Sequence, residues 1–270
     1  MPLAVCATPI GNLEDVTLRL LAELRGAGVI LCEDTRHTRR LLERHEISGA
    51  RLLSYHEHNE AKRTAELVPR LVAGERVALV TDAGMPTISD PGTRLVAAAR
   101  AAGVPVTVLP GPSAIETALA ASGLPVERYA FVGFLPRGAS AVAELVRALR
   151  DTAVVAFESP QRLPRTLRTL AADDETREVA VCRELTKLHE EVVRGTLREV
   201  ALRFAEPPKG EITLVLAPSA RSQGSVEDDV EVALRAVAEL VDAGLPRRRA
   251  AEIVSNLTGV ARNTLYRRTL

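Results

Sequence analysis

The chain has 270 residues, of which 46% are hydrophobic and 26% are charged. This length and composition suffice to bury one or two cores and exclude disorder over most of the chain. No apolar run approaches the roughly 18 to 20 residues of a membrane span, and the N-terminus lacks the basic start of a signal peptide. Three scattered cysteines, Cys6, Cys32 and Cys182, form neither a disulfide framework nor a zinc cluster, which favours a reducing cytoplasm.

The formal net charge of the chain is zero, so any contact with nucleic acid has to come from local clusters of cations. The cations are almost all arginine, since Lys62, Lys187 and Lys209 are the only lysines. Arginine is the better fork for phosphate groups, although a biased genome composition explains the same excess.

Apolar runs of strand length alternate with segments of helical periodicity, which predicts an α/β protein with a largely parallel sheet. Strands are predicted at residues 3–8, 29–32, 76–81, 106–109, 129–134, 152–157, 178–183 and 211–217. After a segment rich in Ser, Gly and acidic residues the pattern is purely helical, with helices predicted at 230–241, 246–256 and 260–268.

Several helix boundaries are predicted from capping residues. Leu13, Val16, Leu20 and Leu24 fall on one helix face. Asp90 is predicted as the N-cap, with Pro91 at N1, of a helix that stops at Gly103. Ser159 and Pro160 are predicted in the same two roles for a later helix. Ser113 and Glu116 are predicted to form the capping box of a helix that ends at Gly123.

The loop at residues 82–92 carries the clearest signal for a ligand site. It follows a predicted strand and contains two glycines, two prolines and two aspartates. Such turn chemistry presents backbone amides and carbonyls in a fixed shape and suits a small molecule. Polar residues also follow the first two strands, at 8–12 and 33–37, where open α/β sheets place ligands. An ordinary turn and a solvated helix cap are the alternatives at these two places.

Two further charged clusters have weaker interpretations. His56, Glu57, His58 and Glu60 surround Asn59, but they lack the spacing of a metal site, and Asn59 suits a helix N-cap. No metal is therefore expected. The charges at residues 183–187 and 209–211 are compatible with structural ion pairs.

The C-terminal segment is basic. From residue 243 onward it carries six arginines against the single acid Glu252, and residues 258–267 suggest the turn and second helix of a helix-turn-helix. A basic helix can grip phosphates; a small helical appendage with a solvated face is the alternative.

The order of these motifs resembles one family. The strings ATPIGNLED (7–15), EDTR (33–36), SYHEHN (54–59), DAGMPTISDPG (82–92), LPGPSA (109–114), GFLPR (133–137), FESP (157–160) and RELTK (183–187) closely resemble the tetrapyrrole (class III) methylase superfamily, in the branch that methylates RNA of the small ribosomal subunit. The resemblance runs from about residue 3 to about residue 217, and the C-terminal piece resembles the helix-turn-helix-like extension of this family.

The resemblance implies two α/β subdomains with S-adenosylmethionine in the cleft between them, and a homodimer. The expected division is an N-terminal subdomain at 1–110, a C-terminal subdomain at 111–218, a linker at 219–229 and a helical rRNA-binding extension at 230–270. The segment Pro110-Gly111-Pro112 is a candidate hinge. The implied product is methylated on the ribose 2′-oxygen of a cytidine in the decoding region of 16S rRNA.

The same resemblance assigns site residues. Cofactor contacts are expected from the first turn, from the loop after the third predicted strand, from the helix start after residue 112 and from three places in the second half: Pro9, Ile10, Gly11, Asp82, Gly84, Met85, Ile88, Ser113, Ala114, Phe157, Leu185, Gly210, Glu211 and Ile212.

The methyl acceptor is a ribose hydroxyl, which must lose its proton or be strongly hydrogen-bonded before it reacts. The candidates for this task are Glu33, Asp34, His37 and Asp82. The expected RNA contacts come from the basic residues Arg36, Lys187, Arg247, Arg248, Arg262 and Arg267. Arginine and lysine at these positions would hold phosphate groups.

Two departures bear on the substrate. The precorrin-type members resemble GxGxGD at the first turn, where this chain has Pro-Ile-Gly-Asn-Leu (9–13), and their GGDP-like loop is here Asp-Ala-Gly-Met-Pro (82–86). Both departures disfavour a porphyrin substrate. The alternatives are a precorrin or uroporphyrinogen methylase and a non-enzymatic helix-turn-helix regulator that binds DNA.

Overall fold

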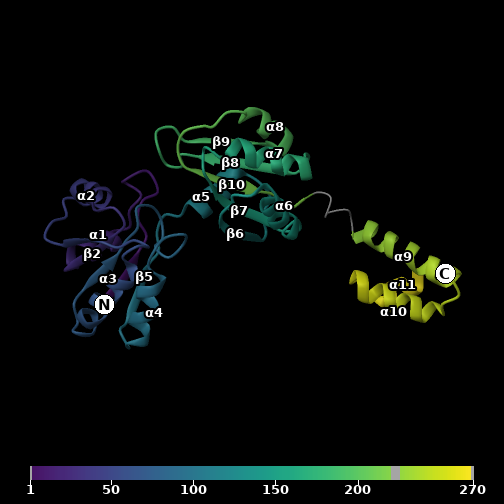
Figure 1. The fold of residues 1–270 in the computed structure, drawn as a ribbon, viewed down its shortest axis with the longest axis horizontal. Coiled ribbons are helices and arrows are strands. Elements are labelled where there is room, and N and C mark those ends of the chain that lie inside the picture. Colours follow the sequence, from purple (N-terminus) through teal and green to yellow (C-terminus); the bar gives the residue numbers. More distant parts are fainter. Residues whose placement is uncertain (1, 220–225, 269–270) are drawn as a thin grey trace.

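The structure is a computed structural model that describes residues 2–219 and 226–268. Two sheets, each with its own helices, lie side by side, and three further helices form a separate group (Figure 1). We call residues 2–109 the first lobe and residues 113–217 the second lobe. The predicted linker at 219–229 includes residues 220–225, which lie outside the described residues, and the division into domains remains a prediction.

The first lobe is a five-stranded parallel sheet with helices on both faces. The strand order is β3-β2-β4-β1-β5, and every pair in it is parallel. Burial of the central strands on both faces explains why they read as continuous apolar runs. The elements are β1 (Leu3–Cys6), α1 (Leu18–Gly26), β2 (Val29–Cys32), α2 (Thr35–Arg44), β3 (Arg51–Ser54), α3 (Glu60–Val72), β4 (Val77–Leu79), α4 (Thr93–Ala101) and β5 (Val106–Leu109).

Two apolar cores hold this lobe together. Helices α1 and α2 pack on one face through residues such as Leu20 and Leu41. Helices α3 and α4 cover the other face through residues such as Leu67 and Leu95. The carboxyl ends of the parallel strands therefore share one edge, where ligand sites of open α/β sheets lie.

The second lobe is a mixed sheet, with order β6-β7-β10-β8-β9. Its class agrees with the α/β prediction, but the pairs β7–β10, β10–β8 and β8–β9 are antiparallel. The short connection between β8 and β9 allows only an antiparallel pairing of these two strands. The elements are α5 (Ala114–Ser122), β6 (Tyr129–Phe134), α6 (Ala139–Ala148), β7 (Ala153–Glu158), α7 (Leu163–Asp173), β8 (Glu178–Arg183), β9 (Glu191–Thr196), α8 (Leu197–Arg203) and β10 (Ile212–Leu216).

Helix α5 links the lobes. Helices α6, α7 and α8 cover one face of the second sheet. On the other face, Ala118 of α5 packs with Ile10 of the first lobe and Leu185 of the second. The first lobe thus contributes an apolar side chain to the core of the second.

The C-terminal helices have their own core. They are α9 (Val226–Asp242), α10 (Arg247–Thr258) and α11 (Arg262–Arg268). Ala233, Val237, Ala250, Val254 and Leu265 are buried among them. Their positions agree with the three predicted helices to within a few residues.

Three predicted helix starts are wrong, and one predicted capping box does not form. Helix α1 begins only after its N-cap Thr17, whose hydroxyl accepts from the Leu20 N–H, so Leu13 and Val16 precede the helix while still packing on its core. Helix α4 has Gly92 as N-cap rather than Asp90.

Helix α7 begins at Leu163, after its N-cap Arg162, rather than at Ser159 and Pro160. The predicted capping box of α5 does not form: Ser113 is the N-cap but makes no side-chain cap. Glu116 instead accepts from the Tyr129 hydroxyl. Asn59 likewise occupies the N-cap position of α3 without capping it.

Candidate functional site

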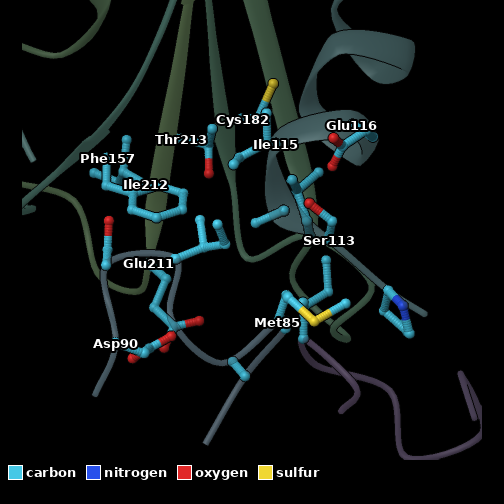
Figure 2. A pocket seen from close by; sticks show the side chains of 18 of the residues that line it. Met85, Asp90, Ser113, Ile115, Glu116, Phe157, Cys182, Glu211, Ile212 and Thr213 are labelled. Atoms are coloured by element: carbon cyan, nitrogen blue, oxygen red, sulfur yellow. The ribbon is translucent and has the colours of Figure 1, made fainter. Parts of the chain in front are cut away.

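A cleft of about 770 Å³ lies between the lobes. Its first-lobe wall comes from Ile10 and the loop that follows β4, and its second-lobe wall comes from the ends of β7, β8 and β10. The connecting segment Pro110–Pro112 and the start of α5 complete it. Figure 2 shows Ser113, Ile115 and Glu116 on one side of this interlobe cleft and Phe157 and Ile212 on the other.

The first βα turn is fixed by backbone hydrogen bonds to the loop after β4. The Thr8 N–H donates to the Gly84 carbonyl at 2.9 Å, and the Gly84 N–H donates to the Thr8 carbonyl at 3.1 Å. Gly84 has a φ of 77°, in the region that favours glycine. This pairing places Ile10 and Gly84 together at the cleft, where a Cβ on Gly84 would lie 3.6 Å from Ile10 Cγ2.

The same turn also contacts the second lobe. A Cβ on Gly11 would lie 2.5 Å from Lys187 Cγ and 2.6 Å from Thr186 Oγ1. The backbone N–H of Asn12 donates to Thr186 Oγ1 at 3.0 Å. The absence of a side chain at Gly11 therefore allows the two lobes to approach closely at one end of the cleft.

The loop at residues 82–92 has a strained and well-fixed backbone. Thr87 and Ser89 have φ values of 76° and 61°, which are uncommon for residues with a side chain. At its far end the Gly92 N–H donates to Glu60 Oε1 at 3.0 Å. This bond replaces the cap that the sequence assigned to Asp90 and leaves the Asp90 carboxyl facing the cleft.

Most residues predicted to contact the cofactor line this one cleft. Pro9 is buried and Gly11 packs on the 185–187 loop, and neither lines the cleft. The predicted residues that do line it are Ile10, Asp82, Gly84, Met85, Ile88, Ser113, Ala114, Phe157, Leu185, Gly210, Glu211 and Ile212.

A second pocket, of about 660 Å³, adjoins the interlobe cleft and shares Ser89 and Asp90 with it. We call it the acidic pocket, because it is lined by four carboxylates and two histidines: Glu33, Glu57, Glu60, Asp90, His56 and His58.

The structure separates the four predicted catalytic residues. Asp82 lines the interlobe cleft and Glu33 lines the acidic pocket, whereas Asp34 and His37 line neither. Asp34 caps α2 by accepting from the Arg36 N–H, and it also pairs with the Arg36 guanidinium. These hydrogen bonds hold the pKa of Asp34 far below its ordinary value.

Asp90 is the site residue that the sequence interpretation missed. It lies where the cleft and the acidic pocket meet. Burial raises the pKa of Asp90 to about 6, and the negative charges of Glu33 and Asp82 add to this effect. Burial and the charge of Asp82 also raise the pKa of Glu33. Such clustered carboxyls are typical of functional sites.

Two other polar groups in the cleft have structural partners. The buried Glu158 carboxylate accepts from the Thr166 hydroxyl and the Ser159 N–H, each at 2.6 Å, and pairs with Arg162. The Cys182 thiol contacts the Ala118 carbonyl at 3.7 Å, and burial raises the pKa of Cys182 to about 12. Both groups stiffen the wall, and the thiol is not a nucleophile at neutral pH.

Some predicted RNA contacts already have protein partners. Lys187 Nζ lies 2.9 Å from Glu184 Oε1 and 2.8 Å from Glu211 Oε2. Arg247 lies over the Tyr266 ring, 4.8 Å from its centroid, and donates to the Tyr266 carbonyl. Arg248, Arg262 and Arg267 are exposed.

Residues 2–219 and 226–268 contain neither a metal-binding cluster nor a helix able to span a membrane. This part of the chain holds no set of three or more His, Cys, Asp and Glu side chains placed to bind a metal ion. None of its helices combines the length and apolarity that crossing a membrane requires.

Comparison with known proteins identifies the family. The family model described as "Tetrapyrrole (Corrin/Porphyrin) Methylases" matches residues 2–201, and the model "RsmI C-terminal HTH domain" matches residues 226–270. The chain belongs to the tetrapyrrole methylase family, as the motif order predicted.

Its curated relatives narrow the class further. A protein of Micromonospora olivasterospora named "Ribosomal RNA small subunit methyltransferase I" is 45% identical over 263 residues, which are 96% of this chain and 83% of that one. A protein of Thermotoga maritima with the same name is 47% identical over 218 residues, or 80% of this chain and 97% of that one.

Solved structures show the same fold at low identity. The methyltransferase CobJ matches with a TM-score of 0.61 and 20% identity over 81% of this chain and 94% of its own. Uroporphyrin-III-C-methyltransferase from Thermus thermophilus matches with a TM-score of 0.56 and 23% identity over 80% and 94%. At this identity the likeness concerns the fold alone.

Proposed function

We propose that this chain is an S-adenosylmethionine-dependent methyltransferase of small-subunit ribosomal RNA, acting on the ribose 2′-hydroxyl of a cytidine in the decoding region of 16S rRNA. The observation that carries the proposal is the interlobe cleft, because residues of the family motifs line it. Relatives that match nearly the whole of this chain bear the rRNA methyltransferase name. The specific nucleotide, the 2′-oxygen and the homodimer come from the family resemblance, and the cytoplasmic location comes from the scattered cysteines.

The cleft suits the cofactor in size and chemistry. Its volume of about 770 Å³ falls within the range of small-molecule sites, roughly 300–1,000 Å³. Met85, Phe157 and Ile212 offer apolar surface for an adenine ring, and Gly84 lets the ligand approach the backbone. Asp82 supplies negative charge that complements the sulfonium and amino groups of adenosylmethionine.

When bound, S-adenosylmethionine supplies a methyl group whose bond to sulfur breaks as the bond to the acceptor oxygen forms, the sulfur keeping the electron pair. Positioning carries much of such catalysis, but the acceptor hydroxyl must also release its proton. We assign this proton to a carboxylate oxygen of Asp90, because Asp90 lines both cavities and its pKa of about 6 leaves it ionised yet basic at neutral pH.

The C-terminal helices supply the main contacts to rRNA. Arg36 is paired with Asp34, and Lys187 is paired with two glutamates, so these two cations have little free charge to offer phosphates. The exposed arginines of α10 and α11, Arg248, Arg262 and Arg267, are the better candidates.

The two alternative functions are less well supported. The tetrapyrrole methylases among the solved structures match at 20–23% identity, whereas relatives at 45–47% identity carry the rRNA methyltransferase name. A DNA-binding regulator has no need of a cleft lined by the methylase motifs.

The test is transfer of labelled methyl from S-adenosylmethionine to small ribosomal subunits from a strain that lacks the modification. The expected label maps to one nucleotide and makes its 3′ bond resistant to nuclease. Calorimetry with S-adenosylmethionine checks the cleft independently. Absence of heat, or label on duplex DNA or tetrapyrrole instead of RNA, would contradict the proposal.

A further inference from the structure

The acidic pocket is separate from the proposed cofactor cleft but opens onto it at Ser89 and Asp90. A molecule bound in the acidic pocket therefore lies beside the ligand bound in the cleft. Its walls come from the end of β2, from the segment that enters α3, and from the strained loop after β4. The loop after β4 belongs to a motif predicted to contact the cofactor, whereas no cofactor contact was predicted for the other walls of the pocket, Glu33 and residues 56–60.

The charge of the acidic pocket selects the chemistry of its occupant. Glu33, Glu57 and Asp90 line it, so a phosphate group is repelled from it. Ionised carboxylates accept hydrogen bonds and cannot donate them. The pocket therefore suits a group that donates hydrogen bonds, such as the exocyclic amine of a nucleobase.

The acids differ in whether they are already engaged. Glu60 accepts from the Tyr55 hydroxyl at 3.1 Å and from the Gly92 N–H at 3.0 Å, so it supports the loop. Within the described part of the chain the Glu33 carboxylate has neither a hydrogen bond nor an ion pair. Burial raises its pKa, which means that a donor placed against Glu33 satisfies a carboxylate that is already partly desolvated.

The wall of the acidic pocket also contains a polar atom without a partner, on the His56 ring. Asn59 Oδ1 accepts a hydrogen bond from the backbone N–H of His56 at 3.0 Å, and Asn59 Nδ2 donates to the Ser54 carbonyl at 3.2 Å. These two bonds fix the orientation of the Asn59 amide. Asn59 Nδ2 also lies 3.0 Å from His56 Nε2. Nε2 is then the acceptor, and the neutral ring carries its proton on Nδ1, which is buried without a partner.

We propose that the acidic pocket binds the base of the nucleotide to be methylated, with Glu33 accepting a hydrogen bond from its exocyclic amine. Cytosine carries such an amine, while uracil has a carbonyl oxygen at the same position, which a carboxylate repels. The base must leave its helix to enter, as bases do in enzymes that modify them. Asp90, at the junction, then lies next to the sugar of the bound nucleotide. This inference rests on the proposed rRNA methyltransferase function.

The decisive variant is Glu33→Gln, since the amide keeps the shape but can donate to uracil. The matched control is Glu43→Gln on α2, which is exposed and lines neither cavity. Small subunits reconstituted with cytidine or uridine at the methylated position serve as substrates. The wild type and E43Q should prefer cytidine by about tenfold or more, and E33Q should bring the ratio of kcat/KM values close to one.

A binding measurement complements the rates. Cytidine and uridine are titrated by ligand-observed NMR against the full chain saturated with S-adenosylhomocysteine, and E33Q should lose the preference for cytidine. Calorimetry with S-adenosylmethionine confirms that E33Q is folded, because Glu33 does not line the cofactor cleft. An unchanged preference in E33Q, or no preference in the wild type, overturns the inference while the rRNA function stands. Absence of methyl transfer from the wild type to either subunit overturns both.

Discussion

The backbone N–H of Asp34 donates a hydrogen bond to Oδ1 of Asp82, with 3.1 Å between the two atoms. The residues follow β2 and β4, which are neighbours in the first sheet. Asp82 is thus oriented in the cleft by the backbone of a residue whose own carboxylate is used to cap α2. Substitution of the Asp34 side chain leaves this bond in place, whereas substitution of Asp82 removes it.

Replacement of Asp82 should weaken cofactor binding according to what the new side chain can accept. Asp82→Ala removes both the negative charge and the acceptor for the Asp34 N–H, so the Kd for S-adenosylmethionine should rise by about tenfold or more. Asp82→Asn keeps an acceptor oxygen and should lose less. Calorimetry measures both, with the exposed Asp151→Asn as control. Equal affinities for all the variants and the wild type would rule out a role for Asp82 in the cleft.

The rate of methyl transfer should depend on the ionisation of Asp90. Because its pKa is raised to about 6, kcat should increase with pH up to this value and then level off. Glu33 and Asp82 act on Asp90 by their negative charges, and Glu57, Glu60 and His56 line the same pocket. Asp90→Asn should lower kcat by about a hundredfold with the affinity for S-adenosylmethionine largely kept.

Stability gives an independent check on Asp90. Its raised pKa means that the protonated carboxyl contributes stability, which is complete below the ordinary value of 3.8 and is lost as the pH rises through about 6. Asp90→Asn should therefore raise the Tm relative to the wild type at about pH 8 and not at about pH 4. A pH-independent difference in Tm would show that Asp90 is not titrating in this range.

A side chain at Gly11 should disturb the approach of the two lobes. In Gly11→Ala the new Cβ meets Lys187 Cγ at 2.5 Å, and overpacking of this kind costs about 1–3 kcal/mol. The Tm should fall and the affinity for S-adenosylmethionine should fall with it. Gly28→Ala is the control, since its Cβ would meet the Arg76 carbonyl at an ordinary 3.6 Å. Wild-type affinity in Gly11→Ala would show that the contact does not shape the cleft.

The arginines of the C-terminal helices should separate into structural and RNA-binding residues. Arg247→Ala removes the stacking on Tyr266 and should lower the thermal stability of this part. Arg248→Ala should keep the stability, weaken binding of small subunits, and reduce the salt dependence of that binding by about one unit of slope. Filter binding at several salt concentrations together with thermal melts measures both. The same loss of RNA binding without loss of stability in Arg247→Ala would contradict this division.

The buried strands could be predicted from the sequence, and so could the edge strands β5 and β6, whereas the edge strands β3 and β9 could not. β1, β2, β4 and β10 are buried along their whole length and are unbroken apolar runs. The two missed strands, β3 and β9, lie at sheet edges and include the exposed Arg51 and Arg194. Each of these two strands contains only two consecutive apolar residues, too few to indicate a strand.

The site could be predicted as far as its motifs are local in the sequence. The cofactor residues of the first half belong to short strings, and most of them line the cleft. Asp90 was misassigned because Asp-Pro is also a helix-start signal. Whether Asp90 caps the helix or lines the cavity depends on the hydrogen bond between Gly92 and Glu60, which lie 32 residues apart in the sequence. A local sequence pattern cannot reveal a bond over this separation.

The position of β10 constrains how the polypeptide matures. This strand is the last of the second sheet in the chain, yet it pairs with both β7 and β8 at the centre of that sheet. The first sheet is complete once Leu109 has been synthesised, and domains generally fold in order as they emerge. The second sheet cannot be completed before Leu216 has been synthesised. A nascent chain therefore has only the first-lobe wall of the cleft until just before the C-terminal helices leave the ribosome.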